Sequence, residues 1–488
     1  MSAGRKVVRN SIFGIISEGF GGALNFAIII IIARLLGTSQ FGVFSYILAL
    51  VGIFQLVADF GLTNVLVREI ARELNDAKRI IDAVRPLVWA FSLVIFVVLV
   101  GLAWGFSATA DEMWATVIMA VAVLAVFHAI VYGSVCRAFE DMGYNAVAFS
   151  MHKVLLLGFV LLALLQEAPS LTALALAYLA ANVLQWLFFF VVVRRRYIRV
   201  GWRIDVAYWK YLLKEAFPIG AAMVFRRVTL HVDTLLLTAM STASAVGLFN
   251  AAYKIIQMVD MIPFTLSIPL FPPFTRLARE SHQKLFDALV QALRIFAVIA
   301  LPIFVWLLFT AHDLVYAFFG EDYAEAAAVL RVLAAAVVFL FPTALFIYVF
   351  SALNRQKYYT LSAGICLATN VVLDVALIPW LGYMGAAYAT LVGEIMFFVT
   401  GVVLLRGLGC VLPFGVIVPK PAVAAVVASV PLYFAVGHGV WMVLAASVVF
   451  VAIYGVAIVA LRAVRPTEIA MLRDSLRRQP KPAEGAAD

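Results

Sequence analysis

Residues 217–240 read FPIGAAMVFRRVTLHVDTLLLTAM. Their length and apolar content suit a membrane-spanning helix, which needs about 20 residues. Arg226 and Arg227 nevertheless stand near the middle, with His231 and Asp233 one to two turns further on. An arginine at mid-membrane costs about 2.5–3.5 kcal/mol, so we expect the pair to face protein or water and to receive an anionic ligand. The alternative is that Arg226 pairs with Asp233 and only holds helices together.

The composition places the chain among membrane proteins. Hydrophobic residues make up 65% of the 488 positions and charged residues only 13%, and the mean hydropathy is +1.05. Soluble domains are about 45–50% apolar and about 25% charged. The net charge of +9 does not indicate nucleic-acid binding, because the basic residues lie in short loops between apolar runs, as topology signals do.

The apolar runs predict an all-α polytopic membrane protein with about 14 transmembrane helices, by the rule of about 20 residues per span. The predicted spans are 12–33, 43–60, 84–106, 113–135, 147–166, 171–193, 212–240, 246–270, 288–310, 327–350, 359–380, 384–405, 418–436 and 440–461.

The charged loops predict the orientation of these spans. If the N-terminus is cytoplasmic, most of the 36 Lys and Arg residues fall in segments assigned to the inside, above all in residues 194–203. The segments assigned to the outside carry mainly acids: Asp111, Glu112, Glu167, Asp313, Glu321, Asp322 and Glu325. We therefore expect a plasma-membrane protein with both termini in the cytoplasm, whose N-terminal apolar run is a retained first helix and not a signal peptide.

Motif searches favour a transporter over an enzyme. The sequence contains no GxxxxGK[ST] nucleotide-binding loop and no HExxH or GxSxG catalytic motif, so we predict no catalytic residues. The three cysteines show no CxxC spacing, and the histidines show no metal-ligand spacing. We therefore expect neither a metal site nor a cofactor, and transport driven by an ion gradient or the membrane potential.

A weak internal repeat indicates two halves. Residues 41–44 (FGVF) open the second predicted span, and residues 246–249 (VGLF) open the eighth. Pairing spans one to six with seven to twelve gives two parallel halves. Transporters with such repeats place their substrate where the halves meet.

Several short motifs, in order over nearly the whole chain, resemble one membrane protein family. They are residues 33–37 (ARLLG), 41–44 (FGVF), 59–62 (DFGL), 320–324 (GEDYA), 329–333 (VLRVL), 370–374 (NVVLD), 378–379 (IP) and 385–390 (GAAYAT) with Glu394. In this order they resemble polysaccharide-export flippases of the multidrug/oligosaccharidyl-lipid/polysaccharide exporter superfamily.

The resemblance implies two six-helix bundles around a central cavity and two further C-terminal helices. The corresponding domains are residues 1–200, 201–410 and 411–462, followed by a cytoplasmic tail at 463–488. It also implies a flippase that moves an oligosaccharide on a polyprenyl (pyro)phosphate from the cytoplasmic to the outer leaflet. The implied partners are this substrate, membrane lipids, a coupling ion (H⁺ or Na⁺) and polysaccharide-assembly proteins, but no nucleic acid.

The predicted substrate-binding residues are Arg226, Arg227 and Lys254, with Asn250 and Gln257. A pyrophosphate cannot cross hydrocarbon without counter-charges, and guanidinium and ammonium groups bind its oxygens by charge-assisted hydrogen bonds. Asn250 (i−4) and Gln257 (i+3) share the helix face of Lys254 and suit a sugar phosphate. The alternative for Lys254 is a side chain that only reaches toward the membrane surface.

Acids inside spans are the candidates for ion coupling: Glu18, Asp233 and Asp260. A buried carboxylate has a raised pKa that a nearby arginine lowers again, so its protonation can follow substrate occupancy. Glu18 is the first choice, because Asn25 lies two turns on along the same face. Hydrogen bonding between helices is the alternative role.

Three alternative functions stay open. A drug/cation antiporter of the same superfamily has a cavity that an arginine pair would not suit, because like charges repel. A flippase for the peptidoglycan precursor would need much the same chemistry. A membrane-embedded glycosyltransferase or polymerase is less well supported, because such enzymes need sizeable outer loops and the loops here are short.

Overall fold

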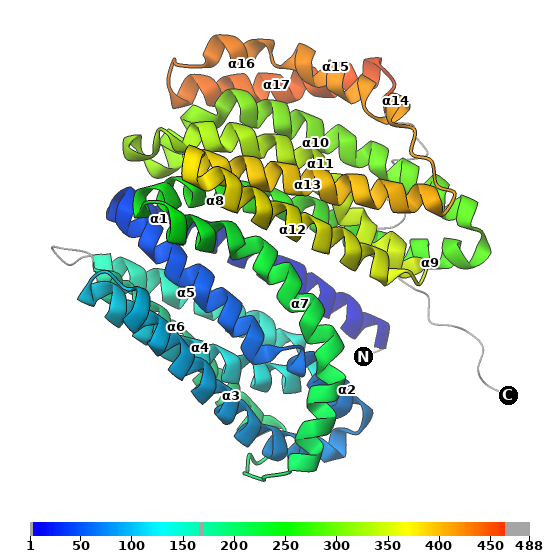
Figure 1. Ribbon diagram of the computed structural model, residues 1–488. Helices are drawn as coiled ribbons and strands as arrows, with labels where there is room; N and C mark the ends of the chain where they lie inside the picture. The colour runs from blue at the N-terminus through cyan, green and yellow to red at the C-terminus, as the bar shows by residue number, and fades with distance from the viewer. Residues whose placement is uncertain (1–2, 165–169, 464–488) are drawn as a thin grey trace. The chain divides into compact units, whose positions relative to one another are not determined.

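A computed structural model describes the backbone of residues 3–164 and 170–463, and the side chains in these ranges except at 3–18, 106, 164, 218–219 and 221–227 (Figure 1). Within the described ranges every regular element is an α-helix or a short 3₁₀ helix. The prediction of an all-α polytopic membrane protein is therefore confirmed. In lipid a helix satisfies all of its backbone groups within one segment, which explains this architecture.

The helix lengths agree with the predicted spans. Twelve helices of the described chain are long and apolar enough to cross a membrane. The first two predicted spans both lie in α1 (Ala3–Asp59), which bends sharply at Gly37, where φ is 69° and ψ is 176°. Glycine adopts a positive φ without steric cost, so Gly37 divides α1 into two helices. The predicted seventh span lies in a further helix, α7 (Val206–Met240).

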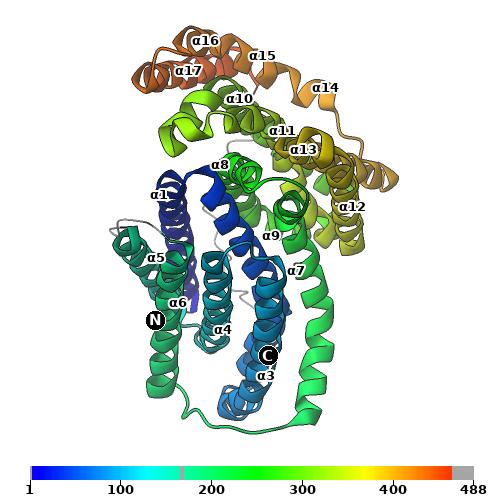
Figure 2. The same cartoon turned by 60° about the vertical axis from the view of Figure 1, so that its left-hand side comes forward.

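The chain forms two compact units, Met1–Leu235 and Leu236–Asp488. The first unit contains α1 and the helices that follow it: α2 (Leu62–Arg72), η1 (Leu74–Asp76), α3 (Ala77–Phe106), α4 (Ala110–Ala138), α5 (Met142–Leu164), α6 (Leu171–Arg196) and most of α7. Helix α4 packs between α3 and α6, and α5 packs against α1 and α6 (Figure 2). Phe127, Tyr132 and Phe189 are fully buried in this core.

The second unit contains the rest of the chain. Its helices are α8 (Ala243–Ser267), η2 (Ile268–Leu270), α9 (Phe271–Glu280), α10 (His282–Phe319), η3 (Glu321–Tyr323), α11 (Ala326–Ala352), α12 (Gln356–Leu381), α13 (Tyr383–Gly407), α14 (Phe414–Ile417), α15 (Pro419–Ala428), α16 (Val430–Ala435) and α17 (Val440–Ala460). Helix α11 is central, because it packs against α8, α10 and α13.

The last helices form a layer on α10, as Figure 1 shows. Trp306 Nε1 on α10 donates a hydrogen bond to Ser447 Oγ on α17 at 2.9 Å. The hydroxyl of Tyr454 donates to the carbonyl of Val298 at 2.7 Å. The two extra C-terminal spans that were predicted are therefore α15 with α16, and α17.

The order of helices repeats between the units. In each unit a long helix, α1 in the first and α8 in the second, precedes a short amphipathic helix, α2 and α9 respectively, and four long helices follow. This order agrees with the repeat expected from the matches at 41–44 and 246–249. The domain boundaries and the central cavity expected from the sequence stay predictions.

Candidate functional site

The stretch that carries the arginine pair is helical. Helix α7 is continuous from Val206 to Met240, although Pro218 lies in its interior. The backbones of Arg226 and Arg227 belong to this helix, but their side chains lie outside the described residues, as does the side chain of Glu18 on α1. The roles predicted for these three residues stay predictions.

The end of α7 that follows the arginines packs on α1. A Cβ atom added at Gly52 of α1 would lie 3.0 Å from Nε2 of His231, so the glycine leaves room for the imidazole. Two residues further on, Asp233 is only 2% exposed. A carboxylate as buried as this one needs hydrogen-bond or ionic partners. This requirement is compatible with both roles considered for Asp233, which are ion coupling and pairing between helices.

The structure brings Lys254 and Gln257 of α8 together. Lys254 Nζ donates a hydrogen bond to Oε1 of Gln257 at 3.0 Å, and both side chains are half-buried. An amide oxygen carries no net charge, so this bond orients the ammonium group without neutralising it. Lys254 lies well inside the part of α8 that is long and apolar enough to cross a membrane, and binding of an anionic ligand by this pair stays a prediction.

Asn250 shares the helix face of Lys254 but is more deeply buried, at 4% exposure. Its Nδ2 donates to the carbonyl of Val246 at 2.9 Å. That bond occupies part of its donor capacity within its own helix. Direct contact between Asn250 and a substrate stays a prediction.

The acids expected to couple an ion lie apart in the chain. Asp260 is half-buried on α8, three residues after Gln257, and belongs to the second unit, whereas Asp233 belongs to the first. Asn370 and Asp374, which share a face of α12, are 4% and 0% exposed. Among the described residues no group of three or more His, Cys, Asp or Glu side chains is placed to hold a metal ion.

Sequence reasoning missed Lys153 on α5. Its Nζ donates a hydrogen bond to Oδ1 of Asn25 on α1 at 2.7 Å. The adjacent His152 contacts a different helix, with Nε2 2.8 Å from Oδ1 of Asn182 on α6. The sequence did contain a signal for this site. Lys153 lies inside the predicted span 147–166, and a lysine within a membrane span has a free-energy cost similar to that of Arg226.

A second polar cluster fixes the linker between α6 and α7, residues 197–205, to the start of α3. The carboxylate of Asp82 accepts a hydrogen bond from the backbone N–H of Gly201. The guanidinium of Arg85 donates to the carbonyl of Gly201 and lies 5.3 Å from the ring centre of Trp202. The backbone N–H of Arg203 donates to the carbonyl of Asp82 at 2.9 Å. These contacts position the chain that leads into α7.

The two ends of this linker are also held. The hydroxyl of Tyr197 donates to Asp141 at 2.6 Å, and burial together with this bond raises the pKa of Tyr197. Past the linker, Trp209 Nε1 donates to the carbonyl of Ala83 at 2.6 Å. Burial and the nearby Glu69 raise the pKa of Tyr208 to about 12, so this phenol stays neutral at physiological pH.

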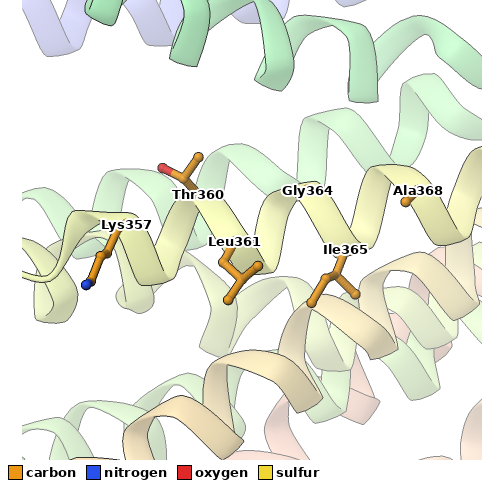
Figure 3. A pocket seen from close by; sticks show the side chains of 6 residues that line it. All are labelled: Lys357, Thr360, Leu361, Gly364, Ile365 and Ala368. Carbon is orange, nitrogen blue, oxygen red and sulfur yellow. The ribbon is translucent and has the colours of Figure 1, made fainter.

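Two surface hollows are lined by residues other than those predicted to bind substrate. One, of about 520 Å³, runs along α12 and is lined by Lys357, Thr360, Leu361, Gly364, Ile365 and Ala368. Figure 3 shows Lys357, Leu361 and Ile365 on the same side of this helix. The other, of about 300 Å³, lies among α2, η1, α3 and the start of α7 and is lined mainly by charged side chains. Neither hollow contains a predicted substrate-binding residue.

Comparison with known proteins assigns the family. The profile of the family described as "Polysaccharide biosynthesis protein" matches residues 7–278. A "Probable low-salt glycan biosynthesis flippase Agl15" of Haloferax volcanii is 23% identical over 390 residues, which cover 79% of this chain and 80% of the relative.

Solved structures of membrane transporters share the fold of this chain. The lipid II flippase MurJ, in an inward closed conformation, superposes with a TM-score of 0.75 at 14% identity over 93% of this chain and 99% of its own. An inward-facing multidrug resistance MATE family transporter of the MOP superfamily superposes with a TM-score of 0.66 at 15% identity over 79% of this chain and 94% of its own. With the fold of these transporters and a match over more than half of its length, the chain belongs to the polysaccharide biosynthesis protein family.

Proposed function

We propose that this protein is a flippase that moves an oligosaccharide linked to a polyprenyl (pyro)phosphate from the cytoplasmic to the outer leaflet. The observation that carries the proposal is the hydrogen bond of 3.0 Å between Lys254 and Gln257 inside a membrane-spanning helix. Helix packing alone would need only apolar side chains at these two positions. The presence of a cation and a polar amide there therefore favours a role in binding an anionic, polar ligand.

The chemistry of the substrate explains why such a pair is needed. A (pyro)phosphate loses its hydration when it enters the membrane, which is prohibitive for an unpaired anion. An ammonium group at mid-membrane compensates this loss by charge-assisted hydrogen bonds. Arg226 and Arg227 would add forked guanidinium groups for the phosphate oxygens, and Gln257 and Asn250 would contact sugar hydroxyls.

The substrate class is supported by the named relatives. Agl15 is named a probable flippase of low-salt glycan biosynthesis, which favours an oligosaccharide cargo here. The fold neighbour MurJ is named a lipid II flippase, so the peptidoglycan precursor is the second candidate. A cationic drug is disfavoured, because the ammonium of Lys254 would repel it. None of these named relatives is an enzyme by name, which is compatible with a protein that transports without catalysis.

Coupling is assigned to acids inside the spans. Glu18, Asp233 and Asp260 are the proposed carriers of H⁺ or Na⁺, and their protonation or ion occupancy would change as the phosphate binds or leaves nearby cations. The proposal includes a plasma-membrane location with both termini in the cytoplasm, as the distribution of Lys and Arg predicts. Polysaccharide-assembly proteins would supply the cargo there.

A competition between cargoes tests the assignment. Purified protein in liposomes would be supplied with a fluorescent polyprenyl-pyrophosphate oligosaccharide, with lipid II, or with a cationic dye. Net transfer of the oligosaccharide lipid across the bilayer, faster than that of lipid II and without transport of the dye, is expected. Faster transfer of lipid II would favour the second candidate, and dye transport alone would refute a flippase.

A further inference from the structure

In the first unit, two adjacent polar residues of α5 contact two different helices, α6 and α1. His152 and Lys153 are consecutive on α5, and consecutive helical residues point about 100° apart, so each can reach a different neighbour. His152 lies 2.8 Å from Asn182 on α6, and Lys153 donates to Asn25 on α1 at 2.7 Å. The lysine therefore lies toward α1 while the histidine anchors α5 to α6.

The charge of Lys153 is not neutralised by a carboxylate that the structure describes. Among the ion pairs of the described side chains, none includes Lys153. Its partner is the neutral amide of Asn25. A lysine in the middle of a membrane-spanning helix is costly, and a single hydrogen bond to a neutral amide offsets only part of that cost. If Lys153 only held α5 against α1, the contact would therefore add little stability.

The surroundings leave the charge within reach of a ligand. A Cβ atom added at Gly21 would lie 3.8 Å from Cγ of Lys153, so the lysine stem lies along the face of α1 that Gly21 shares with Asn25. The side chains of Lys153 and Asn25 are both half-buried. Oδ1 of Asn25 accepts the lysine hydrogen bond, so the NH₂ group of the same amide supplies two further donors.

We propose that Lys153 and Asn25 form an anion-binding site in the first unit for the phosphate of the lipid-linked substrate. This site is additional to the Lys254–Gln257 pair of the second unit, and its assignment to that substrate rests on the proposed function. The ammonium and the amide NH₂ both donate to phosphate oxygens, while His152 and Asn182 hold α5 in place. Each unit then carries one lysine whose ammonium is oriented by a side-chain amide oxygen.

The replacement Asn25→Asp separates this role from a structural one. An aspartate would pair with the ammonium of Lys153, which strengthens the contact between α1 and α5 but removes the net positive charge. Binding of farnesyl pyrophosphate to the full-length protein in detergent, measured by calorimetry, should weaken about tenfold or more. Lys153→Gln should weaken binding equally, Lys153→Arg should retain it, and the exposed Lys284→Gln should leave it unchanged.

The stability of the same variants completes the test. We expect the melting temperature of Asn25→Asp to equal or exceed that of the wild type while its affinity for farnesyl pyrophosphate falls. If Asn25→Asp and Lys153→Gln both bind the probe as tightly as the wild type, Lys153 only connects α5 to α1 and the proposal is wrong.

Flipping of a lipid-linked oligosaccharide by the wild type distinguishes the two proposals. Flipping by the wild type together with unchanged probe binding by both variants overturns the site and leaves the flippase. Absence of flipping together with probe binding that depends on Lys153 overturns the flippase and leaves the anion site.

Discussion

Lys254 and Gln257 lie one turn apart on α8, and the ammonium of the first donates a hydrogen bond of 3.0 Å to the amide oxygen of the second. The amide fixes the direction of the lysine without removing its charge. The replacement Lys254→Gln should therefore lower flipping of a lipid-linked oligosaccharide about tenfold or more, because charge-assisted hydrogen bonds contribute about 1.5–3 kcal/mol.

Liposome flipping rates of Lys254→Gln and Lys254→Arg measure this effect. Arginine keeps the charge and should retain much of the rate. Lys284, which is exposed on α10 and paired with Glu280 at 2.9 Å, gives the matched control Lys284→Gln, expected to flip at the wild-type rate. A wild-type rate for Lys254→Gln would remove Lys254 from the substrate site.

The predicted orientation can be tested by labelling from one side. Asp322 in η3 and Arg355 before α12 are both exposed and are predicted on opposite sides of the membrane. A membrane-impermeant maleimide should label Asp322→Cys in intact cells and label Arg355→Cys only after permeabilisation. The native Cys136, Cys366 and Cys410 are buried, so their background should be low. The reverse labelling pattern would invert the topology.

Asp82 should contribute measurably to stability, because its carboxylate accepts from Gly201 in the linker and is only 6% exposed. Lys78 Nζ also donates to this carboxylate, at 2.7 Å. Asp82→Ala removes the acceptor of both donors and should lower the free energy of unfolding by about 1–3 kcal/mol. Asp76→Ala is the control. Its side chain is 45% exposed, and the carboxylate lies 3.7 Å from Arg79, so the change should stay within about 0.5 kcal/mol. Denaturant unfolding in detergent would measure the stability of both variants. Equal losses of unfolding free energy in Asp82→Ala and Asp76→Ala would contradict a stabilising role for the contact between Asp82 and the linker.

Two glycines of α13 should differ in their tolerance of alanine. A Cβ atom at Gly401 would overlap the buried ring of Phe346 on α11, whereas one at Gly407 meets nothing within 4 Å. Gly401→Ala should destabilise the protein by about 1–3 kcal/mol through overpacking, and Gly407→Ala should have little effect. Melting temperatures in one detergent would compare them, and an unshifted Gly401→Ala would show that α11 and α13 can separate locally.

The sequence predicts the spanning helices well, because about 20 apolar residues have one stable arrangement in lipid. It did not reveal α2 and α9, which have 11 and 10 residues. Such short amphipathic helices are defined by the surface on which they pack rather than by hydropathy. The bend at Gly37 was likewise not predicted. Between two apolar runs, the sequence of a loop cannot be distinguished from that of a helix with a glycine kink.

The candidate site was predictable only in part. Lys254 and Gln257 are three residues apart on one helix, so helical spacing alone brings them together. Lys153 and Asn25 are 128 residues apart, and no local pattern indicates that α5 faces α1. The same holds for Asp82 and Gly201, which are 119 residues apart. Contacts between distant helices depend on the packing of the whole bundle.

The most direct test of the account is flipping of a fluorescent polyprenyl-pyrophosphate oligosaccharide in proteoliposomes, with the wild type compared with Arg226→Ala/Arg227→Ala. We predict that the wild type transfers the lipid across the bilayer and that the double variant, inserted at the same level, loses about tenfold or more of this rate. Equal rates for the two proteins would contradict the cationic substrate site on α7, and failure of the wild type to exceed protein-free liposomes would contradict the flippase itself.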